Sequence, residues 1–281
     1  MSESKLFSVA MCVYSKDDPV WFHQTVDSLL NQTAPPAEII LVVDGPVPEK
    51  LNQEIVRCEE EPLFCVVRLP ENVGHGNARR ISLSHCNHEL VAIMDADDIC
   101  VPDRFEKQLA IFESDPTLAI VGGNIAEFTT SVNEVIGHRV VPSGHDDIVT
   151  YMKTRCPFNQ MTVMFKKSEI EEVGGYQDWY CNEDYFLWVR LLLGGKRFAN
   201  TPDVLVQVRV DENLYKRRGG WKYFKSEAKL QKLMYKEDVI CLGTYLSNVA
   251  IRLFVQVLMP NSLRAVVFKT FFRSKELEKR A

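Results

Sequence analysis

Four short apolar segments in the N-terminal part of the chain limit the folds that it can adopt. They are rich in β-branched residues, and more polar stretches with helical spacing separate them. The segments are FSVAMCVY (7–14), AEIILVVDG (37–45), FCVVRLP (64–70) and LVAIMDADD (90–98). Apolar strands that alternate with helices are typical of a parallel sheet with helices on both faces. The pattern predicts an α/β fold.

The remaining elements follow the same alternation less regularly. Helices are expected at about 19–31, 48–60 and 74–86 between the strands, and RFEKQLAIF (104–112) predicts another after them. LAIVGGNIAEF (118–128) indicates a strand with a glycine break, and NEDYFLWVRLLLGG (182–195) a helix that begins after Asn182. DVLVQVRV (203–210) is expected to be the last strand, and a loop is expected around His138 and His145.

Polar residues stand where each N-terminal strand is expected to end. These residues are Tyr14, Asp44, Asn72 and the acids Asp95, Asp97 and Asp98. Parallel sheets bind ligands at the carboxyl ends of their strands, so these side chains are expected to meet in one site.

The three acids suggest a divalent cation. Alternate residues of an extended segment share a face, so Asp95 and Asp97 are expected to point the same way and Asp98 is not. Two carboxylates without a nearby His or Cys suit Mn²⁺ or Mg²⁺ that takes further ligands from a phosphate-bearing substrate. The alternative is that Asp98 caps the following helix and that Asp95 and Asp97 are turn residues.

Composition places the chain among ordinary globular proteins. The 281 residues carry a net charge of only -5, which gives no reason to expect nucleic acid as a partner. The 8 cysteines form no CxxC pair, so reduced thiols in a cytoplasmic protein are expected. A secretory signal and a long apolar run are both missing from the sequence, so we expect neither secretion nor a spanning helix.

The C-terminal part has a different character. We expect a catalytic domain over 1–220, with a nucleotide-binding half (1–100) and an acceptor half (101–220), and a helical extension over 221–281. The extension places lysines on one helical stripe, and LSNVAIRLFVQVLM (246–259) is apolar apart from Asn248, Arg252 and Gln256. This pattern suits peripheral contact with the inner face of the cell membrane, or a hairpin packed on the domain or on a homodimer partner.

Several motifs in order carry a resemblance to a known family. VAIMDADDICVPDRFEKQ (91–108) is similar to the metal and nucleotide-sugar motif of the family 2 glycosyltransferases, which have the GT-A fold. ENVGHGNAR (71–79) resembles a further junction of that family, and FNQMTVMFKKSEIEEVGGY (158–176) and NEDYFLWVRLLLGG (182–195) resemble its acceptor half. The likeness covers roughly residues 5 to 220 and is nearest to bacterial enzymes of exopolysaccharide, capsule or O-antigen synthesis.

The resemblance implies a role for each matching position. Tyr14 and Asp44 would contact the base and ribose of a UDP-sugar, and Asn72, Gly74 and Arg79 would flank the nucleotide. Asp97 would be the main metal ligand, with Asp95 beside it on the ribose or sugar side. Asp184 matches the general base, and Glu183 would orient it. The alternative for both acids is simple stabilisation of a helix N-terminus.

Side-chain chemistry adds candidates for binding the acceptor sugar and the diphosphate. Trp179, Tyr180 and Trp188 offer flat apolar faces that suit sugar rings, although they are also ordinary core residues. Arg217 and Arg218 stand next to glycines after the last strand, so they are expected on a loop that closes over a diphosphate.

Together these features predict an inverting, metal-dependent hexosyl- or N-acetylhexosaminyltransferase. Its donor would be a UDP-sugar, and its acceptor a saccharide linked to polyprenyl diphosphate. The alternatives are a sugar-nucleotide nucleotidyltransferase, a glycosidase with paired acids and a non-catalytic protein that binds nucleotide sugars.

Overall fold

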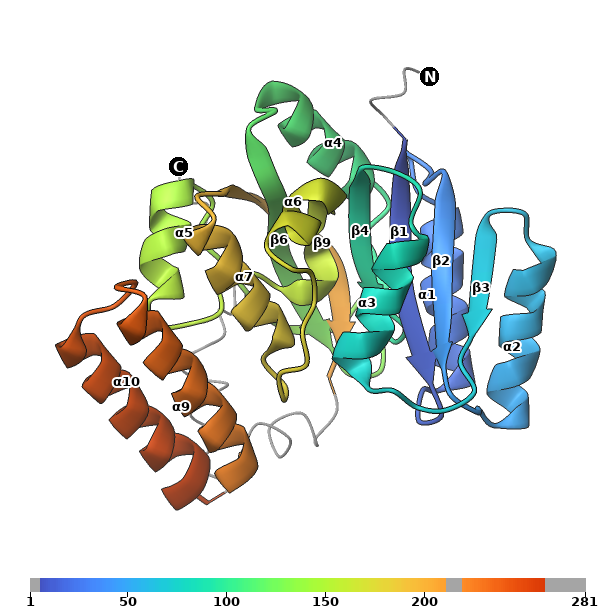
Figure 1. Ribbon diagram of the computed structural model, residues 1–281. Coiled ribbons are helices and arrows are strands. Elements are labelled where there is room, and N and C mark those ends of the chain that lie inside the picture. Colours follow the sequence, from blue (N-terminus) through green and yellow to red (C-terminus); the bar gives the residue numbers. More distant parts are fainter. Residues whose placement is uncertain (1–5, 211–218, 261–281) are drawn as a thin grey trace.

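A nine-stranded sheet forms the centre of the protein in the computed structural model, which describes residues 6–210 and 219–260 (Figure 1). The strands are β1 (Phe7–Tyr14), β2 (Glu38–Asp44), β3 (Phe64–Arg68), β4 (Leu90–Asp95), β5 (Ile99–Cys100), β6 (Leu118–Phe128), β7 (Val135–Arg139), β8 (Met164–Lys166) and β9 (Arg197–Arg209). Their order in the sheet is β3-β2-β1-β4-β8-β6-β9-β5, with β7 paired to β6.

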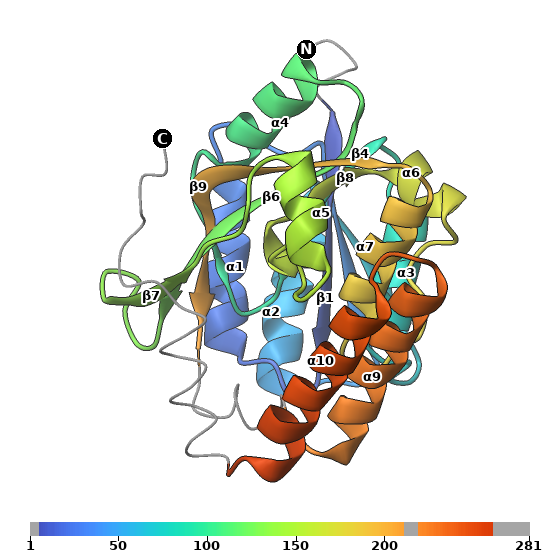
Figure 2. The ribbon, with the colours of Figure 1, turned by 90° about the vertical axis from the view of Figure 1, so that its left-hand side faces the viewer.

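Helices cover both faces of this sheet, which confirms the expected α/β class (Figures 1 and 2). They are α1 (Pro19–Leu30), α2 (Glu49–Glu60), α3 (His75–His85), α4 (Arg104–Ser114), α5 (His145–Met152), α6 (Lys167–Glu172), α7 (Glu183–Leu193), α9 (Trp221–Lys236) and α10 (Leu242–Leu253). Helices α1, α2 and α4 pack in one hydrophobic core, and α3, α5, α6 and α7 pack in the other.

The N-terminal half of the sheet is parallel and sets the register of the strand ends. Strand β1 lies between β2 and β4, and both neighbours run in its direction. Tyr14 lies opposite Asp44, and Cys12 lies opposite Asp95. The polar residues that end these strands are therefore adjacent because of backbone pairing alone.

The C-terminal half of the sheet is mixed. The short strand β8 is antiparallel to both β4 and β6, whereas β6 and β9 are parallel. Strand β9 begins at Arg197, before the expected start of the last strand at 203. The expectation of a loop around His138 and His145 is wrong, because His138 lies in β7 and His145 begins α5.

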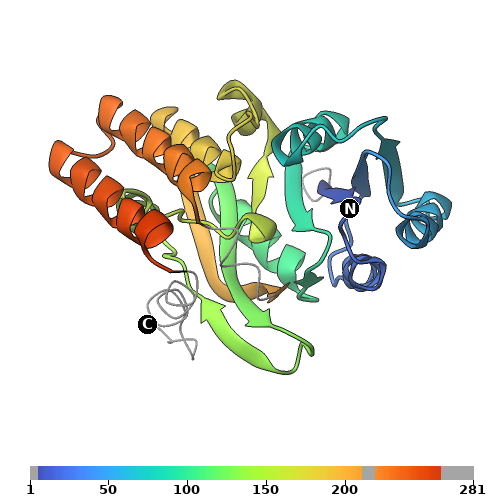
Figure 3. The same ribbon diagram turned by 90° about the horizontal axis from the view of Figure 1, so that it is seen from below.

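A helical hairpin follows the sheet. Helix α9 lies next to α7, and α10 lies at the outer edge of the molecule, as Figures 1 and 3 show. A π-helical turn, η3 (Phe254–Leu258), continues α10. Within the described residues, the helices are all too short or too polar to cross a membrane.

The polar and apolar sides of α10 are reversed relative to an ordinary surface helix. Asn248 and Gln256 are buried, and Arg252 is mostly covered. Five large apolar side chains are exposed instead, namely Leu242, Leu246 and Ile251 of α10 and Phe254 and Leu258 of η3. Helix α10 and η3 thus turn polar groups toward the domain and large apolar side chains outward, whereas α9 packs on the domain through buried apolar residues such as Leu230 and Met234.

The glycine break in β6 is a packing requirement. A Cβ atom at Gly123 would lie 2.6 Å from Leu205 Cδ1 and 2.9 Å from Thr201 Cγ2, and Leu205 is completely buried. Strand β9 can therefore approach β6 closely only where β6 lacks a side chain.

We expect Gly123→Ala to lower the free energy of unfolding by about 1–3 kcal/mol, the usual cost of overpacking a core. Chemical denaturation measures this change. Gly144→Ala is the control, since the nearest atom to its added Cβ would be 4.0 Å away. Equal stability of the two variants would contradict the packing argument.

Candidate functional site

A cavity of about 500 Å³ opens at the carboxyl ends of the parallel strands. Six residues predicted for the donor site line it together, namely Tyr14, Asp44, Asn72, Gly74, Asp95 and Asp97. They come from the ends of β1, β2 and β4 and from the segment between β3 and α3. The expectation that separate strands supply one site agrees with this geometry.

Asp44 fixes the segment after β3. Its Oδ2 accepts a hydrogen bond from Asn72 Nδ2 at 2.9 Å, and its Oδ1 accepts one from the amide of Val73 at 2.7 Å. Gly45 permits this approach, because its φ is +85° and a Cβ there would lie 2.7 Å from the Asn72 nitrogen. The Asp-Gly pair thus shapes one wall of the cavity.

Arg79, which was predicted to flank the nucleotide, is buried outside the cavity lining and connects Asp95 of that lining to Glu183. Its Nη2 donates to Asp95 Oδ1 at 2.8 Å, and its Nη1 lies 3.5 Å from Glu183 Oε1. His75 lines the cavity and also approaches Glu183, with its Nδ1 3.4 Å from Oε1. The positive charge of Arg79 lowers the pKa of His75 to about 4, so this imidazole is neutral near pH 7.

The carboxylates of the Asp95-to-Asp98 segment have different surroundings. Asp95, Asp97 and Asp98 all line the cavity, but Asp98 is only 2 % exposed and accepts a hydrogen bond from the Arg209 amide at 3.0 Å. Burial, reinforced by Asp97 and Asp95, raises the pKa of Asp98. This hydrogen bond joins the segment to the end of β9, so it does not support the alternative interpretation in which Asp98 caps the following helix.

Arg209 gives the cavity a cationic wall. Its guanidinium lies over the rings of Trp21 and Phe128, at 4.9 Å and 4.6 Å from their centroids, and Nη2 donates to Gln24 at 2.7 Å. These contacts hold a positive charge near Asp97, whose backbone oxygen lies 3.4 Å from Arg209 Nε.

Asp17 is a cavity residue that the sequence argument missed. It follows β1 by three positions, and its Oδ2 accepts a hydrogen bond from the Tyr14 amide at 2.9 Å. Burial raises the pKa of Asp17 to about 7, with further contributions from the charges of Asp97 and Asp95. The rule that singled out the strand ends would have found Asp17 if it had included the loop after β1.

The predicted base lies outside the cavity lining. Asp184 is in the first turn of α7, where its Oδ1 accepts a hydrogen bond from the Tyr185 amide at 2.6 Å. Its Oδ2 lies 3.8 Å from Cys156 Sγ. Glu183 connects this helix start to the cavity through Arg79 and His75, and burial raises its pKa.

The three aromatic candidates separate into different environments. Tyr180 is 43 % exposed, and Lys222 Nζ lies 4.0 Å from its ring centroid. Trp179 lies between Phe186, at 4.1 Å between ring centroids, and Lys229 Nζ, at 4.0 Å. Trp188 is completely buried against Phe158. The prediction that Trp188 binds the acceptor is therefore wrong, because no face of its ring is available to a sugar.

Two further predictions concern the arginines of the diphosphate loop and the metal. Arg217 and Arg218 lie outside the described residues. For a metal, no three His, Cys, Asp or Glu side chains within 6–210 and 219–260 form a complete ligand group. Asp95 and Asp97 are thus two carboxylates that would need ligands from a substrate or from water.

With this geometry established, comparison with known proteins identifies the family. The sequence matches glycosyl transferase family 2 over residues 8–171 and glycosyl transferase family group 2 over 90–270. The chain belongs to glycosyl transferase family 2. It is a glycosyltransferase, as the resemblance in its motifs implied.

Curated relatives match over nearly the whole chain. An uncharacterized glycosyltransferase of Haemophilus influenzae is 42% identical over 95% of this chain and 99% of its own. The amylovoran biosynthesis glycosyltransferase AmsE of Erwinia amylovora is 39% identical over 85% and 90%. An Escherichia coli enzyme, UDP-Gal:alpha-D-GlcNAc-diphosphoundecaprenol beta-1,3-galactosyltransferase, is 36% identical over 95% and 96%.

Solved structures agree on the fold. S. aureus TarS 1–349 in complex with UDP-GlcNAc superposes with a TM-score of 0.67 and 15% identity, over 94% of this chain and 75% of that chain. Mannosyltransferase PcManGT from Pyrobaculum calidifontis, in complex with GDP-Man and Mn2+, gives a TM-score of 0.61 and 18% identity, over 94% and 78%. The family 2 enzyme described here therefore has the GT-A fold.

The raised pKa of Asp17 predicts a pH dependence of stability. Between about pH 4 and pH 7 the folded state keeps a proton on Asp17 that the unfolded state loses, so the free energy of unfolding falls as the pH rises. We expect Asp17→Asn to remove this fall, so that its stability relative to the wild type increases up to about pH 7 and then levels off.

Urea denaturation of the unliganded protein at several pH values measures the difference. Asp238→Asn is a suitable control, because Asp238 is exposed and has a φ of 57°, a conformation that Asn also tolerates. A constant difference between Asp17→Asn and the wild type from pH 5 to pH 8 would contradict the expectation.

Proposed function

We propose that this glycosyltransferase moves a sugar from a UDP-sugar, with inversion, to a saccharide linked to a lipid diphosphate. The reaction would serve the synthesis of a bacterial surface polysaccharide. The name of the E. coli relative supports this substrate class, and that of the E. amylovora relative supports a biosynthetic role. The similarity to both extends over most of the chain.

The meeting of Tyr14, Asp44 and Asp97 in one cavity carries the proposal. Tyr14 and Asp44 lie opposite each other at the ends of paired strands, where an aromatic ring and a carboxylate suit a base and a ribose. Asp97 lines the same cavity, which supports a role beside the diphosphate that follows the ribose. This arrangement supports a nucleotide diphosphate over a smaller ligand.

The donor groups in this cavity fit a hard divalent cation such as Mn²⁺ or Mg²⁺. Asp17, Asp95, Asp97 and Asp98 concentrate negative charge there, and their mutual repulsion contributes to the raised pKa of Asp17 and Asp98. Asp97 would hold the cation, and Asp95 would support it while paired with Arg79. A bound cation would neutralise the negative charge of the departing diphosphate.

The start of α7 supplies the base for the acceptor. In the proposed reaction, Asp184 takes the proton of the acceptor hydroxyl as its oxygen bonds to the anomeric carbon. The bond from that carbon to the diphosphate oxygen breaks at the same time, and its electron pair leaves with UDP. Glu183, oriented by Arg79, holds the first turn of α7 against the donor side.

The exposed surface of the hairpin supports contact with lipid. The apolar residues of α10 and η3 face outward, and the lysines of α9 at positions 222, 225, 229, 232 and 236 are exposed on the neighbouring helix. Apolar side chains beside basic ones bind membranes that contain anionic lipid. A lipid-linked acceptor would be met at such a surface.

We expect Asp97→Asn and Asp184→Asn each to lower transfer at least about 100-fold, because the first removes a charged ligand and the second a general base. The assay is release of UDP in the presence of a lipid-linked saccharide and Mn²⁺, with circular dichroism to confirm folding. Asp178→Asn is a matched control, since Asp178 is an exposed carboxylate just before α7. Full activity in either Asp97→Asn or Asp184→Asn would remove the mechanism.

We expect the double variant Leu246→Ser with Phe254→Ser to bind vesicles that contain phosphatidylglycerol about tenfold more weakly than the wild type, since both side chains are 57% exposed and would lose apolar contact. Vesicle co-sedimentation measures this change. Val56→Ser, on α2, is the control. Unchanged binding would contradict lipid contact, as would loss of a dimer without loss of vesicle binding.

A further inference from the structure

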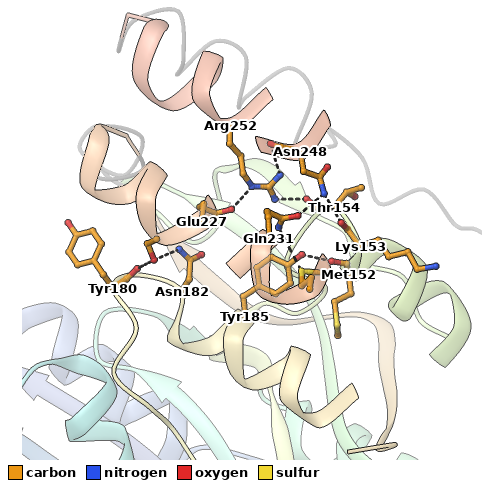
Figure 4. A network of polar contacts seen from close by, with 12 residues as sticks. Met152, Lys153, Thr154, Tyr180, Asn182, Tyr185, Glu227, Gln231, Asn248 and Arg252 are labelled. Carbon is orange, nitrogen blue, oxygen red and sulfur yellow. Dashed lines mark hydrogen bonds and ion pairs between the residues drawn. The ribbon is translucent and has the colours of Figure 1, made fainter. Parts of the chain in front are cut away.

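Helix α9 holds the segment that leads into the first turn of α7, as Figure 4 shows in part. The Ser226 hydroxyl donates to the Tyr180 carbonyl at 2.6 Å and accepts a hydrogen bond from Asn182 Nδ2 at 3.3 Å. The backbone oxygen of Ser226 lies 3.4 Å from Trp179 Nε1. One buried serine thus contacts three of the four residues that precede Glu183.

Two lysines of the same helix reinforce this contact. Lys222 lies over the ring of Tyr180, and Lys229 lies over the ring of Trp179, each at 4.0 Å. Phe186 of α7 covers Trp179 at 4.1 Å between ring centroids. Trp179 is therefore packed between α7 and α9, so its role is to join these helices.

Helix α10 holds a second segment near Asp184, namely the stretch of chain that follows α5. Asn248 Nδ2 donates to the Lys153 carbonyl and Arg252 Nη2 donates to the Thr154 carbonyl, both at 2.8 Å, where the chain leaves α5 (Figure 4). Arg252 is itself held by Glu227 of α9 at 2.5 Å. Two residues beyond Thr154, Cys156 Sγ lies 3.8 Å from Asp184 Oδ2.

Tyr185, the residue after Asp184, connects α7 directly to the end of α5. The hydroxyl of Tyr185, which is 2 % exposed, donates to the Met152 carbonyl at the end of α5. The hairpin thus contacts both segments that flank the Asp184 carboxylate, although no residue of the hairpin lines the donor cavity.

We propose that the α9–α10 hairpin is a working part of the acceptor site, and that Ser226 is a positioning residue that sets the orientation of the Glu183–Asp184 turn. The inference rests on the proposed function of Asp184 as base. Catalysis depends steeply on the placement of a base relative to its substrate, so a small rotation of this turn is enough to slow proton removal. The donor cavity would be unaffected, because its lining comes from other elements.

The test is Ser226→Ala in the full-length protein. Alanine is favoured within a helix, and the change leaves the buried Arg252–Glu227 pair in place, so the variant is expected to fold. We expect kcat for transfer to fall about tenfold while Kd for UDP with Mn²⁺ stays the same. Ser247→Ala, an exposed serine in α10, makes the same chemical change and is expected to leave kcat unaltered.

Hydrogen–deuterium exchange gives a second measurement that does not depend on activity. Amides of residues 180–186 are expected to exchange faster in Ser226→Ala than in the wild type or Ser247→Ala. Unchanged kcat together with unchanged exchange would overturn the inference, as would a loss of thermal stability with no loss of kcat. A wild-type protein that transfers no sugar would refute the proposed function. The positioning role of Ser226 would then still be tested separately, because unaltered exchange in Ser226→Ala would refute it.

Discussion

The buried charge of Arg79 is the constraint on which the arrangement of the site depends. Its side chain is 6 % exposed, and burial alone would lower the pKa of Arg79, yet Asp95 and other neighbouring groups raise it overall. A buried guanidinium that lost one of these partners would carry an uncompensated charge, at a cost of several kcal/mol. Arg79 therefore connects α3 to the end of β4, on the proposed donor side, and to the start of α7, on the proposed acceptor side.

The contacts of Arg79 would explain how one sheet can position both the proposed donor and the proposed acceptor. The parallel strands bring Tyr14, Asp44 and Asp95 together by register alone, so the donor side needs little support from side chains. The acceptor side has no such backbone constraint, because Asp184 stands on a helix that covers the sheet. Its position is set by packing and by polar contacts with α5 and the hairpin.

The contrast between the two sides also marks how far the sequence could predict the structure. Strand ends follow from the alternation of apolar runs, so the cavity and six of its lining residues could be predicted. Asp17 was missed because it lies in a loop beyond its strand, and Trp188 was misjudged because aromatic residues in an apolar helix do not reveal which of them face the core. The contact of Ser226 with Tyr180 joins residues 46 positions apart, and no periodicity in the sequence records it.

The reversed helix α10 gives these polar contacts a consequence beyond the site. A surface helix ordinarily buries its apolar side, which is the less costly arrangement in water. Here Asn248 and Arg252 are turned inward, where they bind the backbone after α5, and Leu246 and Ile251 are left outward. Exposed hydrocarbon is stabilised by a second apolar phase, so contact with lipid would relieve the cost of this orientation. The same polar contacts that support the segments around Asp184 would then also hold the apolar side of α10 and η3 toward a membrane, where the proposed lipid-linked acceptor would lie.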